Sequence, residues 1–140
     1  MIRHVQIPLC MILTLAACDN PFSPTVENMA GTYQATRLQV DSAGHITDYV
    51  AIGSAITLEL DPAGTVSGHL FIVGGNEDGG DMDADMAGTW ALAGDTVTFD
   101  QAADTFVRDY VFTASRGGLR SEHRAAAAGA TVTVVFTKRD

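Results

Sequence analysis

Apolar and polar residues alternate along most of the chain, which is typical of strands that bury one face. The run 56–60 places Ile and Leu on one side and Thr and Glu on the other, and the same period of two returns after a turn at 61–64. Val and Thr are enriched in these runs, in agreement with strand. The pattern predicts an inward set of Tyr33, Ile56, Leu58, Leu60, Val66, Leu70, Ile72, Trp90, Leu92, Val97, Phe99, Tyr110, Phe112, Val132, Val134 and Phe136.

Three places break the regular alternation. Between Ala35 and Leu38 the apolar phase slips, which predicts a β-bulge or a bend in the first strand. Residues 100–105 fit either one helical turn or a plain loop. The alanines at 125–128 and Gly129 are too few for a helix of their own, so we expect them to connect a hairpin.

A short repeat divides the body of the chain. Residues 29–33 read Met-Ala-Gly-Thr-Tyr and residues 86–90 read Met-Ala-Gly-Thr-Trp. Each half would supply about four strands. About eight antiparallel strands in a chain of this size favour an all-β, up-and-down barrel, because closure removes exposed sheet edges. A β-sandwich is the alternative.

The second copy of the repeat contains Gly88-Thr89-Trp90, a Gly-x-Trp that opens a strand. Together with the strands at 97–99 and 131–137, it makes residues 29–140 similar to small bacterial lipocalin-like lipoproteins. In true lipocalins the motif lies on the first strand, where this chain has Tyr33. The resemblance implies a barrel that binds a small apolar ligand, and a basic residue that packs over the Trp, for which Lys138 and Arg139 are the candidates.

The first 18 residues carry the features of an export signal. Arg3 precedes an apolar run over 5–15, followed by Leu15-Ala16-Ala17-Cys18. This is the pattern of a secretory signal peptide, and the run is too short to span a bilayer. The last four residues resemble a bacterial lipobox, whose cysteine becomes the lipidated first residue. An ordinary signal peptide that ends near a cysteine is the alternative.

This N-terminus predicts three segments: a helical signal peptide at 1–17, lipidated Cys18 with a flexible tether to residue 28, and the barrel at 29–140. We expect a membrane-anchored lipoprotein of the bacterial cell envelope that faces the periplasm or the cell surface. Cys10 is lost with the signal and Cys18 carries the lipid, so the mature domain has no disulfide.

Charge and length narrow the function. The chain has 140 residues and a net charge of −9, which suits one acidic domain, expected to be a monomer. Nucleic-acid binding requires a basic patch, and the sequence shows none. No nucleophile, phosphate-loop or metalloprotease motif is present, so we expect no catalysis. His45, His69 and His123 lack metal-ligand spacing and are expected at the surface.

Two polar segments are candidates for other chemistry. Carboxylates gather in a Gly-rich stretch at 74–85, and Ca²⁺ takes such oxygen ligands. The calcium candidates are Asp78, Asp81, Asp83 and Asp85, but the spacing departs from an EF-hand, so a solvated acidic connection is the alternative. Arg108, between Asp104 and Asp109, fits an anion clamp or, more simply, an ion pair at a strand end.

Three functions therefore stay open. The first is a binding module in which the barrel holds a small apolar ligand, with contacts from Tyr33, Trp90, Phe99, Tyr110 and Phe112. The second is a structural or interaction lipoprotein whose side chains fill the barrel, since eight strands leave little free interior. The third, a hydrolase or isomerase, has no motif to support it.

Overall fold

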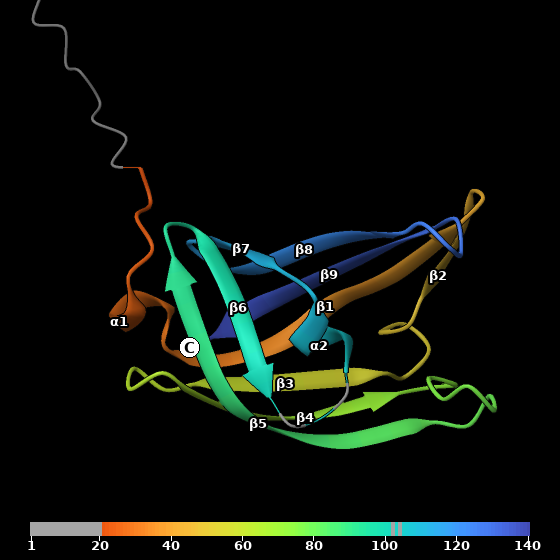
Figure 1. Ribbon diagram of the computed structural model, residues 1–140, viewed down its shortest axis with the longest axis horizontal. Helices are drawn as coiled ribbons and strands as arrows, with labels where there is room; N and C mark the ends of the chain where they lie inside the picture. The colour runs from red at the N-terminus through yellow and green to blue at the C-terminus, as the bar shows by residue number, and fades with distance from the viewer. Residues whose placement is uncertain (1–20, 102, 104) are drawn as a thin grey trace, which may run out of the picture.

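The computed structural model describes residues 21–101, 103 and 105–140, which form a closed antiparallel barrel. Eight strands close it, because β1 pairs with both β3 and β9, and β2 is an extra strand on the far part of β1 (Figure 1). The predicted all-β barrel is confirmed, and the sandwich alternative is wrong. The strands are β1 (Gly31–Ser42), β2 (His45–Asp48), β3 (Ala55–Leu60), β4 (Thr65–Ile72), β5 (Met82–Ala93), β6 (Thr96–Gln101), β7 (Phe112–Ser115), β8 (Gly118–Ala125) and β9 (Ala130–Arg139).

The phase slip in β1 is a β-bulge, as the sequence predicts. The register of β1 against β9 shifts between Ala35 and Arg37. Ala35 and Leu38 are buried on either side of the bulge, while Thr36 and Arg37 are both exposed. The extra residue lets β1 bend, so that its first part pairs with β3 and its last part pairs with β2.

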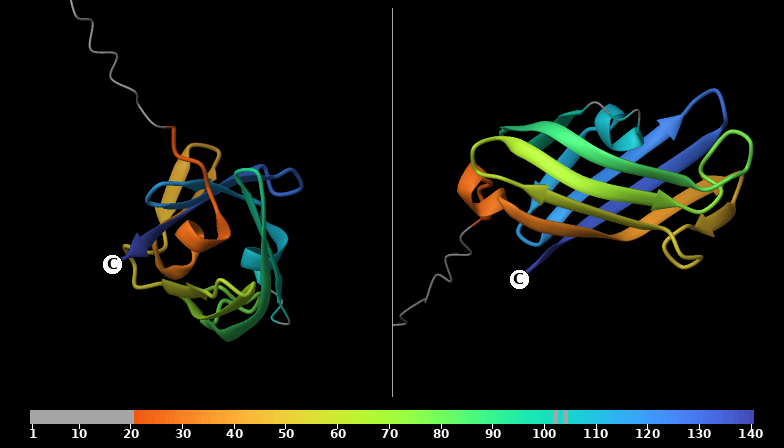
Figure 2. Two further views of the ribbon diagram at one scale, coloured as in Figure 1. Left: turned by 90° about the vertical axis from the view of Figure 1, so that its left-hand side faces the viewer. Right: turned by 90° about the horizontal axis from the view of Figure 1, so that it is seen from below.

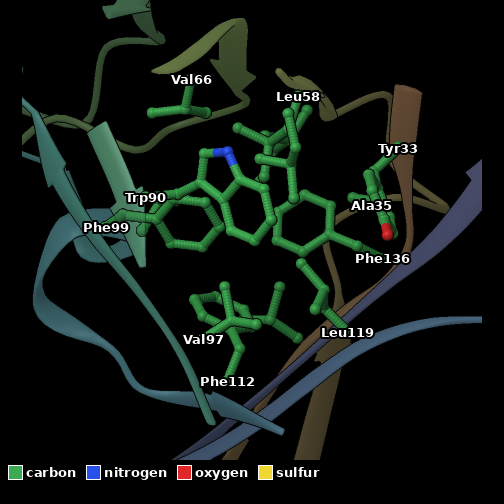
Figure 3. Packing of buried hydrophobic residues seen from close by; sticks show 14 of the residues in the cluster. Tyr33, Ala35, Leu58, Val66, Trp90, Val97, Phe99, Phe112, Leu119 and Phe136 are labelled. Carbon is green, nitrogen blue, oxygen red and sulfur yellow. The ribbon is translucent and has the colours of Figure 1, made fainter. Parts of the chain in front are cut away.

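The inward residues of the strands fill the interior of the barrel. In β3, Ile56, Leu58 and Leu60 are buried and alternate with exposed residues. Figure 3 shows aromatic rings and aliphatic side chains from most strands packed against one another. Burying one such side chain stabilises the fold by about 1.5–3 kcal/mol. The predicted inward set is confirmed except for Leu92, Tyr110 and Val132, which are only partly buried.

A short helix, α1 (Val26–Met29), lies across one end of the barrel (Figure 2). The Thr25 hydroxyl accepts from the Asn28 amide and the Asn28 side chain accepts from the Thr25 amide, a capping box that starts the helix. Met29 is buried, and Phe22 and Val26 pack against the core. Helix α1 therefore begins within the last residues of the predicted tether, and the division into signal peptide, tether and barrel stays a prediction.

The two copies of the repeat bury the same two positions, the methionine and the aromatic residue, but their backbones differ. Met29 and Met86 are both buried, as are Tyr33 and Trp90. Met29 ends helix α1, whereas Met86 lies inside strand β5. Both basic residues that the sequence offers as the partner of the Trp lie beside β1. Lys138 pairs with Tyr33 in register and donates from Nζ to the Asn28 carbonyl, and Arg139 pairs with Thr32. Trp90 instead donates from its indole nitrogen to the Asp61 carbonyl.

Three glycines lie where a Cβ atom would collide with the backbone of the neighbouring strand. A Cβ on Gly88 would lie 2.0 Å from the Asp100 carbonyl oxygen, and one on Gly118 would lie 2.0 Å from the Phe136 carbonyl oxygen. A Cβ on Gly68 would likewise lie 2.1 Å from the Thr57 carbonyl oxygen of β3. Only a residue without a side chain fits such a contact, so these positions allow the sheet to curl into a narrow barrel.

Candidate functional site

An apolar pocket of about 230 Å³ lies at the end of the barrel opposite α1. The strand register places it there: Leu38 and Val40 are in the distal part of β1, Ile72 ends β4 and Val132 is near the start of β9. The pocket is lined by Leu38, Val40, Tyr49, Ile72, Gly74, Gly75, Phe106, Tyr110 and Val132. Apolar walls with a few polar groups are typical of sites for small molecules.

Helix α2 (Phe106–Asp109) supplies the aromatic side of the pocket. The rings of Phe106 and Tyr110 lie 5.5 Å apart and tilted at 47°. Tyr110 also stacks on His123 of β8, with 4.4 Å between centroids and 18° between planes. Burial raises the pKa of the Tyr110 hydroxyl, and the negative charge of Asp109 raises it further. At neutral pH this hydroxyl is therefore protonated and can donate one hydrogen bond.

Two connected loops form the opposite side. The Tyr49 amide donates to the Leu38 carbonyl at 2.8 Å, and the Ser54 amide donates to the Tyr49 carbonyl at 2.9 Å. The buried Ser54 hydroxyl in turn accepts from the Val73 amide at 2.9 Å. These bonds hold the 49–54 turn against the loop that follows β4, so Tyr49 is fixed at the rim of the pocket.

Tyr110 is the one residue of the predicted ligand set among those that line this pocket. Tyr33, Trp90, Phe99 and Phe112 instead pack in the core, where Phe99 and Phe112 meet edge to face at 5.5 Å (Figure 3). Ligand contact by these four residues stays a prediction.

Tyr33 has a structural role, because its buried side chain links β1 to helix α1. Its hydroxyl donates to the Met29 carbonyl at 2.6 Å, and burial raises its pKa to about 12. The bond ties β1 to the helix that covers the α1 end of the barrel. The side chain therefore has a partner within the fold, with its ring fully buried.

The sequence interpretation missed Phe106 and Tyr49. Alternation does not identify Phe106, because α2 is a single turn that begins just after the stretch judged to be a loop or helical turn. Arg108 lies on the same helix and forms an ion pair with Asp109 at 2.9 Å, as the simpler interpretation predicts, although on a helix and not at a strand end.

The four calcium candidates have two kinds of partner. Asp78 and Asp81 accept from the amides of Gly80 and Gly74, both at 2.9 Å. Asp83 and Asp85 lie on β5 beside His69 of β4. In the described part of the chain, no group of three or more metal-ligating side chains could hold an ion. Calcium binding stays a prediction, tested by the melting temperature in millimolar calcium.

His69 lies between the two carboxylates on the outside of the barrel. Its Nδ1 is 2.9 Å from an Asp85 oxygen and its Nε2 is 3.3 Å from an Asp83 oxygen. The hydrogen bond to Asp85 raises the pKa of His69; desolvation lowers it, and the charges of Asp83 and Asp85 raise it again. The exposed position agrees with the predicted surface location.

The predicted signal peptide and Cys18 lie outside the described residues. Within residues 21–101, 103 and 105–140, no helix is long and apolar enough to cross a membrane.

No protein-family model matches the chain, and no curated protein matches it. Among solved structures, the chain is similar to a complex of bovine odorant binding protein with a selenium-containing odorant. The identity is 16% and the TM-score is 0.42, with 89% of this chain and 78% of that chain covered.

Proposed function

We propose that this protein is a non-catalytic lipoprotein of the bacterial cell envelope, whose barrel holds a small apolar ligand in the pocket beneath α2. The observation that carries the ligand proposal is the set of apolar side chains around that pocket. Leu38, Ile72 and Val132 lie on the barrel side, and Phe106 and Tyr110 lie at the two ends of α2. The rest of the interior is filled by side chains, so a ligand would occupy the end of the barrel and not its centre.

The volume limits what such a ligand can be. About 230 Å³ is below the ~300 Å³ at which ligand pockets usually begin, but above the ~150 Å³ of an engineered cavity that binds benzene. The proposed ligand is therefore a small aromatic or short aliphatic molecule, or one end of a longer one. The Tyr110 hydroxyl offers a hydrogen bond to a single polar group on it.

Titration with a small apolar fluorophore tests the ligand proposal. N-phenyl-1-naphthylamine should brighten on binding to the wild-type protein. Val132→Trp fills the pocket and should weaken that response at least tenfold. Ile46→Trp adds the same ring at an exposed position on β2 and should change it less than twofold. An equal response from all three proteins would contradict binding in the pocket.

A filled barrel that binds no ligand is the second candidate. It is favoured by the complete burial of Tyr33, Phe112 and Phe136 in the centre of the barrel. The same titration separates the two, because a packed structural lipoprotein would show no saturable response in the wild type.

Membrane anchoring rests on the Leu15-Ala16-Ala17-Cys18 sequence. Lipid chains on Cys18 would hold the barrel firmly at a bilayer, since each buried CH₂ contributes ~0.8 kcal/mol. Mass spectrometry of the protein from a bacterial host should find a diacylglyceryl group on an N-terminal Cys18, and Cys18→Ala should abolish processing. An unmodified Cys18 would contradict the anchor.

A further inference from the structure

The charges of this acidic chain are separated around the barrel. Residues 38–107 contain no lysine or arginine, although twelve of the 17 acids lie there. Apart from Arg3 and Arg37, every lysine and arginine lies in 108–140. The sheet order places β3 to β6 on one side of the barrel and β7, β8, β9 and β1 on the other (Figure 1). Among the described residues, every lysine and arginine except Arg108 of helix α2 therefore lies on or between β7, β8, β9 and β1, despite the net charge of −9.

A groove of about 420 Å³ lies on the outer surface of this cationic side. It is lined by Thr36, Arg37, Arg120 and Val135. Both arginines pair in register with Val135, so the three residues form one row across β1, β9 and β8. With neighbouring strands ~4.8 Å apart, the two arginine Cα atoms are about 10 Å apart. Two guanidinium groups thus flank one hollow.

The bulge in β1 builds one wall of this groove. In a regular strand, Thr36 and Arg37 would point to opposite faces. Because the bulge inserts one residue, both are exposed on the outer face. The Thr36 hydroxyl lies 2.9 Å from the Thr137 hydroxyl and donates to the Val135 carbonyl at 3.4 Å. A hydroxyl therefore lies in the wall next to the Arg37 guanidinium.

The arginines have few competing partners. Arg120 contacts Glu122, with 3.2 Å between Nη2 and Oε2. Within residues 21–101, 103 and 105–140, the Arg37 side chain has neither an ion pair nor a hydrogen bond. Glu122 and Asp41 line a neighbouring groove and would repel an anion from it. The donor groups of the Arg37 guanidinium are therefore available to an anion in the groove.

We propose that the groove between Arg37 and Arg120 binds a phosphate group, carried by a soluble compound or by a lipid headgroup. Arginine forks match the oxygens of phosphate, and a tetrahedral group can present different oxygens to two guanidiniums on opposite walls. A carboxylate, with two coplanar oxygens, suits a single fork. This site is on the outside of the barrel, so it is independent of the pocket beneath α2.

Arginine side-chain NMR on the full chain in neutral sugar-detergent micelles tests the proposal. Inorganic phosphate, added at constant ionic strength, should shift the Nε–H signals of Arg37 and Arg120 saturably. Arg37→Gln should weaken phosphate binding at least tenfold. Arg116→Gln removes an equal charge from the β7–β8 turn and should weaken it less than twofold.

A second experiment distinguishes a lipid headgroup from a soluble phosphate compound. It records the same spectra in phosphatidylcholine bicelles with and without phosphatidylglycerol. A shift of the Arg37 and Arg120 signals with phosphatidylglycerol assigns a lipid headgroup, and a response to inorganic phosphate alone assigns a soluble compound. The proposal is overturned if neither probe moves these signals more than those of Arg116, or if Arg116→Gln weakens binding as much as Arg37→Gln.

Discussion

The indole nitrogen of Trp90 donates a hydrogen bond to the backbone carbonyl of Asp61, 2.8 Å away. The Trp90 amide also donates to the Gly64 carbonyl at 2.9 Å. One residue of β5 therefore holds both ends of the turn between β3 and β4. The tryptophan of the Gly-x-Trp motif here ties a hairpin to its neighbouring strand.

Replacing Trp90 with Phe should destabilise the protein by about 1–3 kcal/mol. The variant leaves the Asp61 carbonyl without its indole donor and leaves space where the larger ring packed. Urea unfolding followed by far-ultraviolet circular dichroism measures this difference. A free energy of unfolding within 0.5 kcal/mol of the wild type would contradict the role of this hydrogen bond.

The close contact at Gly88 predicts that an alanine there destabilises the protein much more than an alanine at Gly117. Gly88→Ala should cost about 3 kcal/mol or more, because its Cβ would lie 2.0 Å from a carbonyl oxygen of β6 and a backbone cannot move aside easily. Gly117→Ala, with nothing within 4 Å, is the control and should stay within about 0.5 kcal/mol of the wild type. Thermal unfolding compares the two, and equal losses would refute the close approach of β5 and β6.

His69 should titrate above the ordinary value of 6.5, chiefly because of its hydrogen bond to Asp85. Because the pKa of His69 is higher in the folded state than in the unfolded chain, the protonated imidazole stabilises the fold. This stabilisation is fully present below pH 6.5 and is lost as the pH rises through the folded-state pKa. Asp85→Asn should lower the pKa of His69 toward its ordinary value. Proton NMR of the imidazole measures the midpoint, and an unchanged midpoint in Asp85→Asn is the contrary outcome.

Tyr33 makes the fold sensitive to alkali. Its pKa of about 12, raised from 10.0 by burial, means that the folded state keeps this proton while the unfolded chain releases it. Stability from the neutral hydroxyl is therefore lost as the pH rises from 10 to 12. Tyr33→Phe should be less stable than the wild type at pH 8, and the difference should shrink by pH 12. Urea unfolding at both values gives the difference, and a constant gap would disagree with a buried hydroxyl.

Much of the fold was predictable because burial imposes a period of two on each strand. The alternation at 56–60 and the slip between Ala35 and Leu38 both correspond to local backbone geometry, namely strand β3 and the bulge in β1. The buried core residues were predictable for the same reason, since they are the inward members of each alternation. Tyr110 was misplaced because alternation continues from Tyr110 to Phe112, although Tyr110 caps helix α2 and only Phe112 is in β7.

The pocket and the cationic groove were not predictable, because both depend on which distant residues become neighbours. Val40 and Val132, which both line the pocket, become neighbours only when β9 pairs with β1. Arg37 and Arg120 are far apart in the sequence and lie in one row only through Val135. The net charge gave no sign of these two arginines, because the acids outnumber the cations. Most of the acids lie on the side formed by β3 to β6.

Methyl NMR with a small aromatic molecule tests the central claim most directly, which is that the pocket beneath α2 holds an apolar ligand. Naphthalene should shift the methyl signals of Leu38, Ile72 and Val132 saturably and show nuclear Overhauser contacts to them. The exposed Ile46 methyls serve as the internal control and should not move. If naphthalene moves no pocket methyl, or moves Ile46 as much as Val132, the pocket is not a ligand site.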